Sequence, residues 1–302
     1  RLLMLPATAM GEQLFDGDAA RLLLIGNALH ADTPIDAPGS GVMGFLLVML
    51  AQDGGFPVPV GGAGQLTAAL VKRAGSAGAQ VQCGREVSAI DVRGGRAVAV
   101  HTSDGGTVRV RRAVVADVSA PSLYERLPPH EALPARLLQD LQHFTWDTPV
   151  VKVNYALDAP IPWRSKSLQG AGTVHLGADG HGLIRWLADL NTATIPDHPF
   201  LLFGQMSTAD PSRSPAGTES AWAYTHLPRE HNDDGSADRL AQSVDQVLEE
   251  HAPGFGSHVV GRVVQRPSDL QSSDANLSGG AVNGGTAQLQ QQLIFRPSPG
   301  FG

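Results

Sequence analysis

The sequence contains a single cysteine, Cys83, among 302 residues. It therefore has no internal disulfide framework and no zinc site built from several cysteines, and we expect Cys83 to be a small buried residue of a strand. Basic residues are also scarce: 22 Lys and Arg against 29 Asp and Glu give a net charge of -7. This balance argues against a nucleic-acid groove, and the one local basic run, "VRVRR" at 108 to 112, alternates like an exposed strand face.

Long hydrophobic runs are missing as well. Near the N-terminus the longest is "GFLLVML" at 44 to 50, less than half of the ~20 residues that a helix needs to cross a bilayer. The opening "RLLMLPATAM" lacks the basic region and continuous apolar stretch of a signal peptide. We therefore expect a cytoplasmic protein without a membrane span.

The familiar catalytic and metal-binding motifs are absent from the sequence. The eleven histidines form no H-E-x-x-H pattern, and no G-x-S-x-G nucleophile motif occurs. His175 and His181, in "HLGADGH", fit a loop better than a metal site. We predict no metal site, and the catalytic residues stay unassigned.

Two glycine-rich stretches require an interpretation. A G-x-G-x-x-G pattern occupies residues 39 to 44, but "DTPIDAP" before it is poor strand material, so the dinucleotide-binding interpretation is weak. The Gly-Gly-Ala-Gly run at 61 to 64 lacks the Lys-Ser/Thr of a phosphate-binding loop. We favour a turn that lets the following helix start close to a cofactor or substrate, and a phosphate loop is the alternative.

Hydrophobic periodicity predicts an alternation of helices and strands. Helices are expected at 16 to 32, 42 to 52, 65 to 74, 131 to 144 and 233 to 253. The helix at 42 to 52 is apolar on nearly all sides, so it is either buried in the core or borders an apolar cavity. Strands are expected at 79 to 83, 86 to 93, 96 to 103, 107 to 117, 148 to 158, 200 to 206 and 258 to 266.

Two relationships among these elements also follow from the pattern. Gly94-Gly95 and Asp104-Gly105-Gly106 join three strands into an antiparallel meander, because glycine adopts the positive φ of tight hairpins without strain. The segment 200 to 206 is the expected sheet partner of 148 to 158. The aromatic residues of the middle portion either pack the core or line a pocket for an apolar ligand: Trp163, Trp186, Phe203 and Trp222.

The stretch "FPVPVGGAGQLTAALVKRAGSAGAQVQCGREVSAIDVRGGRAVAVHTSDGGTVRVRRAVVADVSAP", which ends at residue 121, resembles the phytoene desaturase and carotenoid isomerase-like flavoproteins of the amine oxidase-like superfamily. The shared features are a Pro-x-Gly-Gly turn before a helix, an apolar strand, and an "EV-x-x-I" strand leading into a meander. "LSGGAVNGGTAQLQQQLIFRPSPG" at 277 to 300 resembles the segment before the family's last flavin-binding element.

The resemblance implies an α/β fold in which part of an FAD-binding, Rossmann-like domain of the glutathione-reductase type is interleaved with a mixed-sheet and helical substrate domain. The corresponding division is 1–54 for the helical part of the substrate domain, 55–121 for part of the FAD domain, 122–254 for the substrate domain and 255–302 for the return segment. The family's first βαβ unit and its final glycine-rich helix have no counterpart here, so the resemblance implies an internal fragment.

The resemblance also implies residues that face the cofactor, FAD. Glu86 and Val87 match the strand whose backbone faces the adenine. Ala116 and Asp117 match the segment that passes close to the dinucleotide, although Asp117 fits a loop cap equally well. Gly61 and Gly62 would allow the next helix to begin against the cofactor without a Cβ clash.

The resemblance implies an FAD-dependent dehydrogenase or desaturase that acts on an apolar, polyene or lipid-like small molecule by hydride transfer to the flavin. Such chemistry needs no protein acid or base, because the flavin accepts the hydride. The fragment alone is expected to bind FAD weakly and to be inactive. An alternative is a non-catalytic protein of the same fold that carries a lipid or isoprenoid or binds a protein partner. Peripheral membrane contact is expected if the substrate is a lipid.

Overall fold

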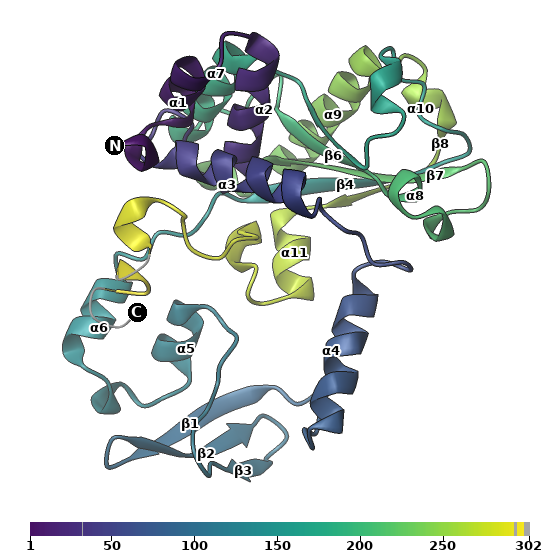
Figure 1. The fold of residues 1–302 in the computed structure, drawn as a ribbon. Helices are drawn as coiled ribbons and strands as arrows, with labels where there is room; N and C mark the ends of the chain where they lie inside the picture. The colour runs from purple at the N-terminus through teal and green to yellow at the C-terminus, as the bar shows by residue number, and fades with distance from the viewer. Residues whose placement is uncertain (32, 293–294, 299–302) are drawn as a thin grey trace. The chain divides into compact units, whose positions relative to one another are not determined.

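The computed structural model describes residues 1–302 except 32, 293–294 and 299–302. The chain divides into two compact units, Arg1–Ala68 with Asp147–Val282 and Ala69–Trp146 with Asn283–Gly302. Each unit has its own antiparallel sheet, one of five strands and one of three (Figure 1). Among the helices of these described ranges, none has the length and hydrophobicity needed to cross a membrane.

The first unit is built around the five-stranded sheet, in the order β5-β6-β7-β4-β8. Its strands are β4 (Val150–Leu157), β5 (Thr173–Leu176), β6 (Leu201–Gln205), β7 (Glu219–His226) and β8 (Val259–Gln265). The predicted direct pairing of 148–158 with 200–206 is wrong: β6 belongs to the same sheet, but β7 lies between it and β4. Periodicity identifies strands and not their order, because order depends on long-range contacts.

The first unit also contains eight α-helices among its described residues. They are α1 (Ala7–Leu14), α2 (Asp18–Ala28), α3 (Ser40–Asp53), α7 (Gly180–Asn191), α8 (Met206–Ala209), α9 (Asp234–His251), α10 (Phe255–His258) and α11 (Pro267–Ser273). A further helix, α4 (Gly64–Ser76), crosses the boundary between the two units.

Helix α9 covers one face of the five-stranded sheet and builds the main core. Leu240, Val244 and Leu248, four residues apart, are fully buried against the alternate residues of β4 that include Val151 and Val153. Burial of each such side chain contributes about 1.5–3 kcal/mol. The predicted amphipathic helix at 233 to 253 is therefore confirmed, together with the face that it buries.

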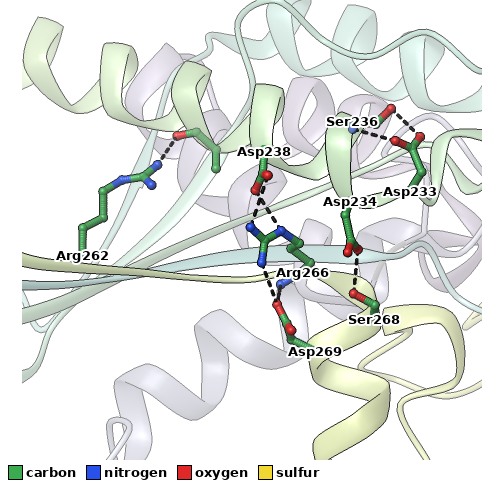
Figure 2. Close-up of polar contacts among 9 residues, drawn as sticks. Asp233, Asp234, Ser236, Asp238, Arg262, Arg266, Ser268 and Asp269 are labelled. Atoms are coloured by element: carbon green, nitrogen blue, oxygen red, sulfur yellow. Dashed lines mark hydrogen bonds and ion pairs between the residues drawn. The ribbon is translucent and has the colours of Figure 1, made fainter.

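Polar contacts at the end of β8 join α9 to α11 (Figure 2). The guanidinium of Arg266 donates to both carboxylate oxygens of Asp238, at 2.9 and 3.2 Å, and lies 3.4 Å from Asp269. Ser268 Oγ donates to Asp234 Oδ1 at 2.7 Å. Bidentate Arg–carboxylate pairs define orientation better than single surface ion pairs, so this network fixes how α11 leaves the sheet.

The helices α1, α2, α3 and α7 pack together on the first unit (Figure 1), and the glycine pattern at 39 to 44 serves this packing. Gly39 has φ 85° at the N-cap of α3, and Gly41 and Gly44 are buried. A Cβ on Gly44 would collide with the C=O of Leu24 in α2. The weak dinucleotide-site interpretation therefore gives way to close helix packing. Helix α3 is not a core helix, since Phe45 is 44% and Leu50 is 51% exposed.

The second unit contains the predicted meander of β1 (Val87–Arg93), β2 (Arg96–Thr102) and β3 (Thr107–Arg109), followed by α5 (Ala120–Arg126) and α6 (Ala135–Leu141). Gly94 and Gly95 have φ of 56° and 73° at the first hairpin, as the dipeptide predicted. Ile90 is buried, and its N–H donates to the C=O of Leu127 at 2.9 Å.

One strand prediction in this unit is wrong and another is too long, since only Thr107–Arg109 of the predicted strand at 107 to 117 forms β3. Residues 79–83 and 110–117 lie outside regular structure, and Val81 and Val115 are 57% and 95% exposed. Cys83 is consequently exposed rather than buried. A strand needs a partner for its N–H and C=O groups. Among the described residues no strand pairs with 79–83, and the pairing with β2 ends after the N–H of Val110, which donates to the C=O of Val98 at 2.9 Å. Their β-type sequence is therefore not sufficient to form a strand.

Candidate functional site

The paired glycines lie in the first unit, immediately before α4. Gly61 and Gly62 have φ of 84° and 94°, which glycine adopts without strain. The N–H of Gly61 donates to Asp210 Oδ2 at 2.6 Å, and a Cβ on Gly62 would collide with the guanidinium of Arg213. The turn is thus a close-approach turn with respect to the loop at 210–213. Its role toward a cofactor stays a prediction.

The other predicted cofactor residues belong to the second unit. The C=O of Glu86 accepts the N–H of Ser103 at 2.9 Å, so this carbonyl is already paired within the sheet. Val87 begins β1, an edge strand of the meander. Ala116 and Asp117 are exposed and lie after β3, outside regular structure. The contacts of these four residues with FAD also stay predictions.

The face of the five-stranded sheet opposite α9 carries a row of four chemically distinct side chains. The register places His175 of β5 opposite Leu202 of β6, Leu202 opposite Tyr224 of β7, and Tyr224 opposite Lys152 of β4. Directly opposite residues in antiparallel strands share a face, and neighbouring strands lie about 4.8 Å apart. His175 and Lys152 therefore stand about 14 Å apart at the two ends of one row.

A cavity of about 640 Å³ lies on this face at the β5 end. Most of its lining is apolar. These side chains come from α2, α3, the loop after α3, the 3₁₀ turn before β5, β6 and β7: Leu23, Leu47, Phe56, Leu168, Leu202 and Trp222. A concave apolar site with a few polar groups is the usual form of a small-molecule site. Leu47 of α3 belongs to the lining, so of the two alternatives for this helix the cavity border is the correct one.

The indole of Trp222 packs against Tyr224 of its own strand, β7, and against Gly204 of the neighbouring strand, β6. It stacks on Tyr224 with ring centroids 5.9 Å apart and an interplanar angle of 13°. Gly204 is its cross-strand neighbour on β6, and a Cβ there would collide with the indole. Of the four aromatic residues proposed from the sequence, Trp222 lines the cavity, whereas Trp163, Trp186 and Phe203 are buried in the core clusters.

Lys152 is the charged residue of this face that sequence reasoning missed. Its ammonium lies 6.0 Å from the centroid of the Trp222 ring, and burial lowers the pKa of Lys152 from its ordinary value of 10.5. Within the described ranges, no carboxylate forms an ion pair with it. The available signal was a lysine inside the apolar alternation "VVKVNYAL", at a position where a half-buried cation is costly unless it has a role.

Two histidines mark the opposite end of the row. His30, in the 3₁₀ helix η2 (Leu29–Ala31) after α2, has its Nε2 3.1 Å from the Nε2 of His175. Burial, with a smaller contribution from His30, lowers the pKa of His175 to about 4. The imidazole is accommodated because Gly26 has no Cβ, which would lie 2.6 Å from His175 Nδ1. His181 does not line this cavity. It lines a separate surface depression beside Asp179.

Similarity to known proteins identifies the family to which this chain belongs. The profile of the family described as "Flavin containing amine oxidoreductase" matches residues 5–271. The chain belongs to this family. A curated relative, pyridine nucleotide-disulfide oxidoreductase domain-containing protein 2 of Rattus norvegicus, is 27% identical over 322 residues, covering 99% of this chain and 54% of that protein. The Mus musculus protein of the same name is 26% identical with the same coverage. The chain spans about half the length of these relatives.

Solved structures show the same fold at low identity. An oxidoreductase from Methanosarcina mazei matches 87% of this chain and 56% of its own with a TM-score of 0.56 and 15% identity. Putrescine oxidase bound to putrescine matches 93% of this chain and 56% of its own with a TM-score of 0.55 and 14% identity. The expected mixed α/β flavoprotein fold is therefore confirmed at the level of the amine oxidase-like fold.

The membership implies FAD, and the residues of the sheet face suit a flavin in two respects. The lining of the cavity is mostly apolar and would limit the access of water to a flavin ring bound beside it. Lys152 supplies a cation without a carboxylate partner among the described residues, and a flavin gains negative charge when it is reduced. The donor set and the lining thus fit the cofactor.

Proposed function

We propose that this protein is an FAD-dependent oxidoreductase of the dehydrogenase or desaturase type that acts on an apolar, polyene or lipid-like molecule. The apolar cavity on the sheet face is the observation that supports this proposal most directly. When bound, FAD would supply the hydride acceptor for such a substrate. The phytoene desaturase-like assignment belongs to this proposal and rests on the resemblance of residues 56 to 121 and 277 to 300.

The chain's own residues bind and orient the substrate in this scheme. Leu202 and Trp222 provide the floor of the cavity, and Phe56 and Leu47 close it from the side of the preceding segments. Lys152 holds a positive charge at the far end of the row. There it would stabilise the negative charge that a bound flavin gains on reduction. The residues predicted from the resemblance stay the proposed cofactor-binding residues: Gly61, Gly62, Glu86, Val87, Ala116 and Asp117. The histidine pair defines the other end of the cavity.

A second candidate is a non-catalytic carrier of lipids or isoprenoids. The exposed apolar side chains of α3 favour it, since Met43, Phe45 and Met49 are 38%, 44% and 46% exposed. The same side chains favour contact with a membrane surface during substrate exchange. The two candidates differ in one observable, the reduction of bound flavin by substrate.

The test uses protein expressed from the complete gene. We expect it to purify with a yellow flavin chromophore, and we expect a linear isoprenoid polyene in micelles to bleach that absorbance under anaerobic conditions, whereas putrescine does not. A colourless protein that still binds the polyene would favour the carrier. Bleaching by putrescine alone would contradict the apolar substrate.

The chain 1–302 serves as the comparison in the same experiment. We expect a fluorescence titration with FAD to give no submicromolar binding, because the predicted contacts of this chain are backbone contacts of one turn and one strand. Submicromolar affinity would show that these residues hold the cofactor on their own.

A further inference from the structure

The mouth of the apolar cavity has one side on a helix and one side outside regular structure. Among the apolar residues that line the cavity, Leu23 and Phe56 are 57% and 60% exposed, so they lie at its mouth. Val174 and Leu202 are buried and lie at its floor. Leu23 is held within α2, whereas Phe56 belongs to residues 54–60, which follow α3 and precede the glycine turn.

Residues 54–60 form a strap that is anchored at both ends. The N–H of Gly54 donates to the C=O of Leu50 at 3.1 Å, at the end of α3. Directly after the strap, the N–H of Gly61 donates to Asp210 Oδ2 at 2.6 Å. One end is therefore fixed to a helix and the other to the loop at 210–213.

The middle of the strap has no such anchor. Within the described part of the chain, residues 55–58 take part in no hydrogen bond, and Pro57 has no N–H to donate. Gly55 has φ 67°, and a Cβ there would meet no atom within 4 Å. A segment with few hydrogen bonds and few buried contacts opens at a low cost in free energy. The strap can therefore change conformation between its anchors.

The aromatic ring of Phe56 favours the closed position of the strap. It is the one side chain of the strap that lines the cavity, and the part of its surface that is buried packs against apolar neighbours. An apolar ligand in the cavity would offer the ring more apolar surface to cover, and removal of that surface from water is favourable. A bound ligand should therefore hold Phe56 over the mouth.

We propose that the strap is the gate of the apolar cavity, with Phe56 as the side chain that closes the mouth and Gly55 as the hinge. Ligands enter and leave when Phe56 moves away from the mouth, and the ring returns over an apolar ligand once it is bound. This rests on the proposed function for the identity of the cavity as a substrate site. It extends that function by assigning control of substrate exchange to one side chain.

Release of a fluorescent polyene from the chain tests the gate without a flavin reaction. The chain is loaded with diphenylhexatriene, whose fluorescence is quenched when it transfers to phosphatidylcholine vesicles that contain a nitroxide-labelled lipid. Stopped-flow mixing gives the rate of release, and the fluorescence that remains at equilibrium gives the relative affinity. Because the affinity is the ratio of the entry and release rates, removal of a gate accelerates both and changes the affinity little.

Variants at the two sides of the mouth assign the effect to the strap. Phe56→Ala is expected to increase the release rate about tenfold and to lower the affinity by no more than about threefold, because the barrier to release falls. Phe56→Trp is expected to slow release by at least about twofold, and it covers the case in which the Ala variant fails to fold. The matched control is Leu23→Ala, an equally exposed lining residue on a helix, whose release rate should rise only as its affinity falls.

The outcomes separate this inference from the proposed function. A release rate that rises in Phe56→Ala only as much as the affinity falls would make Phe56 an ordinary contact and overturn the gate alone. Faster release in Leu23→Ala beyond its loss of affinity would also overturn the gate, since the width of the mouth would then control exchange. Failure of diphenylhexatriene to bind the unaltered chain would overturn the apolar substrate site, and the gate with it.

Discussion

The N–H of Gly61 donates to the carboxylate of Asp210 at 2.6 Å, across 149 positions of the sequence. This bond, together with one from the Ser212 hydroxyl, lowers the pKa of Asp210 below its ordinary value of 3.8. The glycine turn before α4 is thus anchored on the loop after β6 and not only shaped by its own glycines. The charge of one carboxylate controls how firmly the turn is held.

Asp210→Asn should therefore destabilise the chain in a pH-dependent way. Because the pKa is lowered on folding, the contribution of the carboxylate is present above 3.8 and is lost as the pH falls through the folded value. Urea unfolding should show a difference in the free energy of unfolding between wild type and variant that is constant above about pH 5. This difference should become smaller toward more acid pH. A difference in the free energy of unfolding that does not change with pH would mean that the charge of Asp210 does not contribute to stability.

His175 gives a pH dependence of the same sign at higher pH, because its pKa is also lowered on folding. Its pKa falls from 6.5 to about 4 on folding, so between these values the unfolded chain binds a proton that the folded chain does not. The free energy of unfolding should therefore decrease as the pH falls from 6.5 to about 4. In His175→Gln this decrease should be absent. Titration of the imidazole resonance by NMR checks the value directly, and a midpoint near 6.5 would contradict it.

Thr225→Val is expected to stabilise the protein. Thr225 is 1% exposed, and its Oγ1 has no hydrogen-bond partner within the described part of the chain. Replacing an unsatisfied hydroxyl by a methyl group of the same shape should raise the free energy of unfolding by about 1 kcal/mol. Thr225→Ser keeps the hydroxyl and is the control. A destabilised Val variant would show that the hydroxyl is bonded in solution, for example to a buried water.

Lys152 should affect stability and activity in opposite directions. Lys152→Met removes a half-buried ammonium whose pKa burial lowers, so the unfolding midpoint of the chain should not fall. In the protein from the complete gene, the same change should slow reduction of the flavin by at least about tenfold, because the cation on the sheet face is lost. Lys152→Arg is the control that keeps the charge. Unchanged reduction in the Met variant would remove Lys152 from the site.

The apolar face of α4 should promote association of the isolated chain. Leu66, Leu70 and Val71 are 58%, 59% and 44% exposed, and α4 has no buried residue. Replacing Leu66 and Leu70 by Gln should lower the sedimentation-derived mass at high concentration without lowering the unfolding midpoint, since exposed apolar patches drive association. Lys72→Gln on the same helix is the matched control, and equal association of all three proteins would contradict this expectation.

Local patterns predicted the elements that complete their own hydrogen bonds or bury a regular stripe. Helix α9 and the hairpin at Gly94–Gly95 are examples, because i,i+4 spacing and positive φ are properties of neighbouring residues. The segments 79–83 and 110–117 have strand-like sequences and form no strand, because a strand depends on a partner that periodicity does not supply. The sequence left two alternatives open for α3, a core helix or a cavity border, because its uniform hydrophobicity gives no direction for the core.

The sequence by itself determined the mixed α/β class, the flavoprotein resemblance and the paired-glycine turn, since each depends on residues that lie close together along the chain. Only the tertiary structure decided the order of the five strands, and with it the row from His175 to Lys152. The physical reason is that strand pairing brings together residues from distant parts of the sequence. The set of side chains on the sheet face therefore depends on the register between strands, and no single segment of the sequence specifies that register.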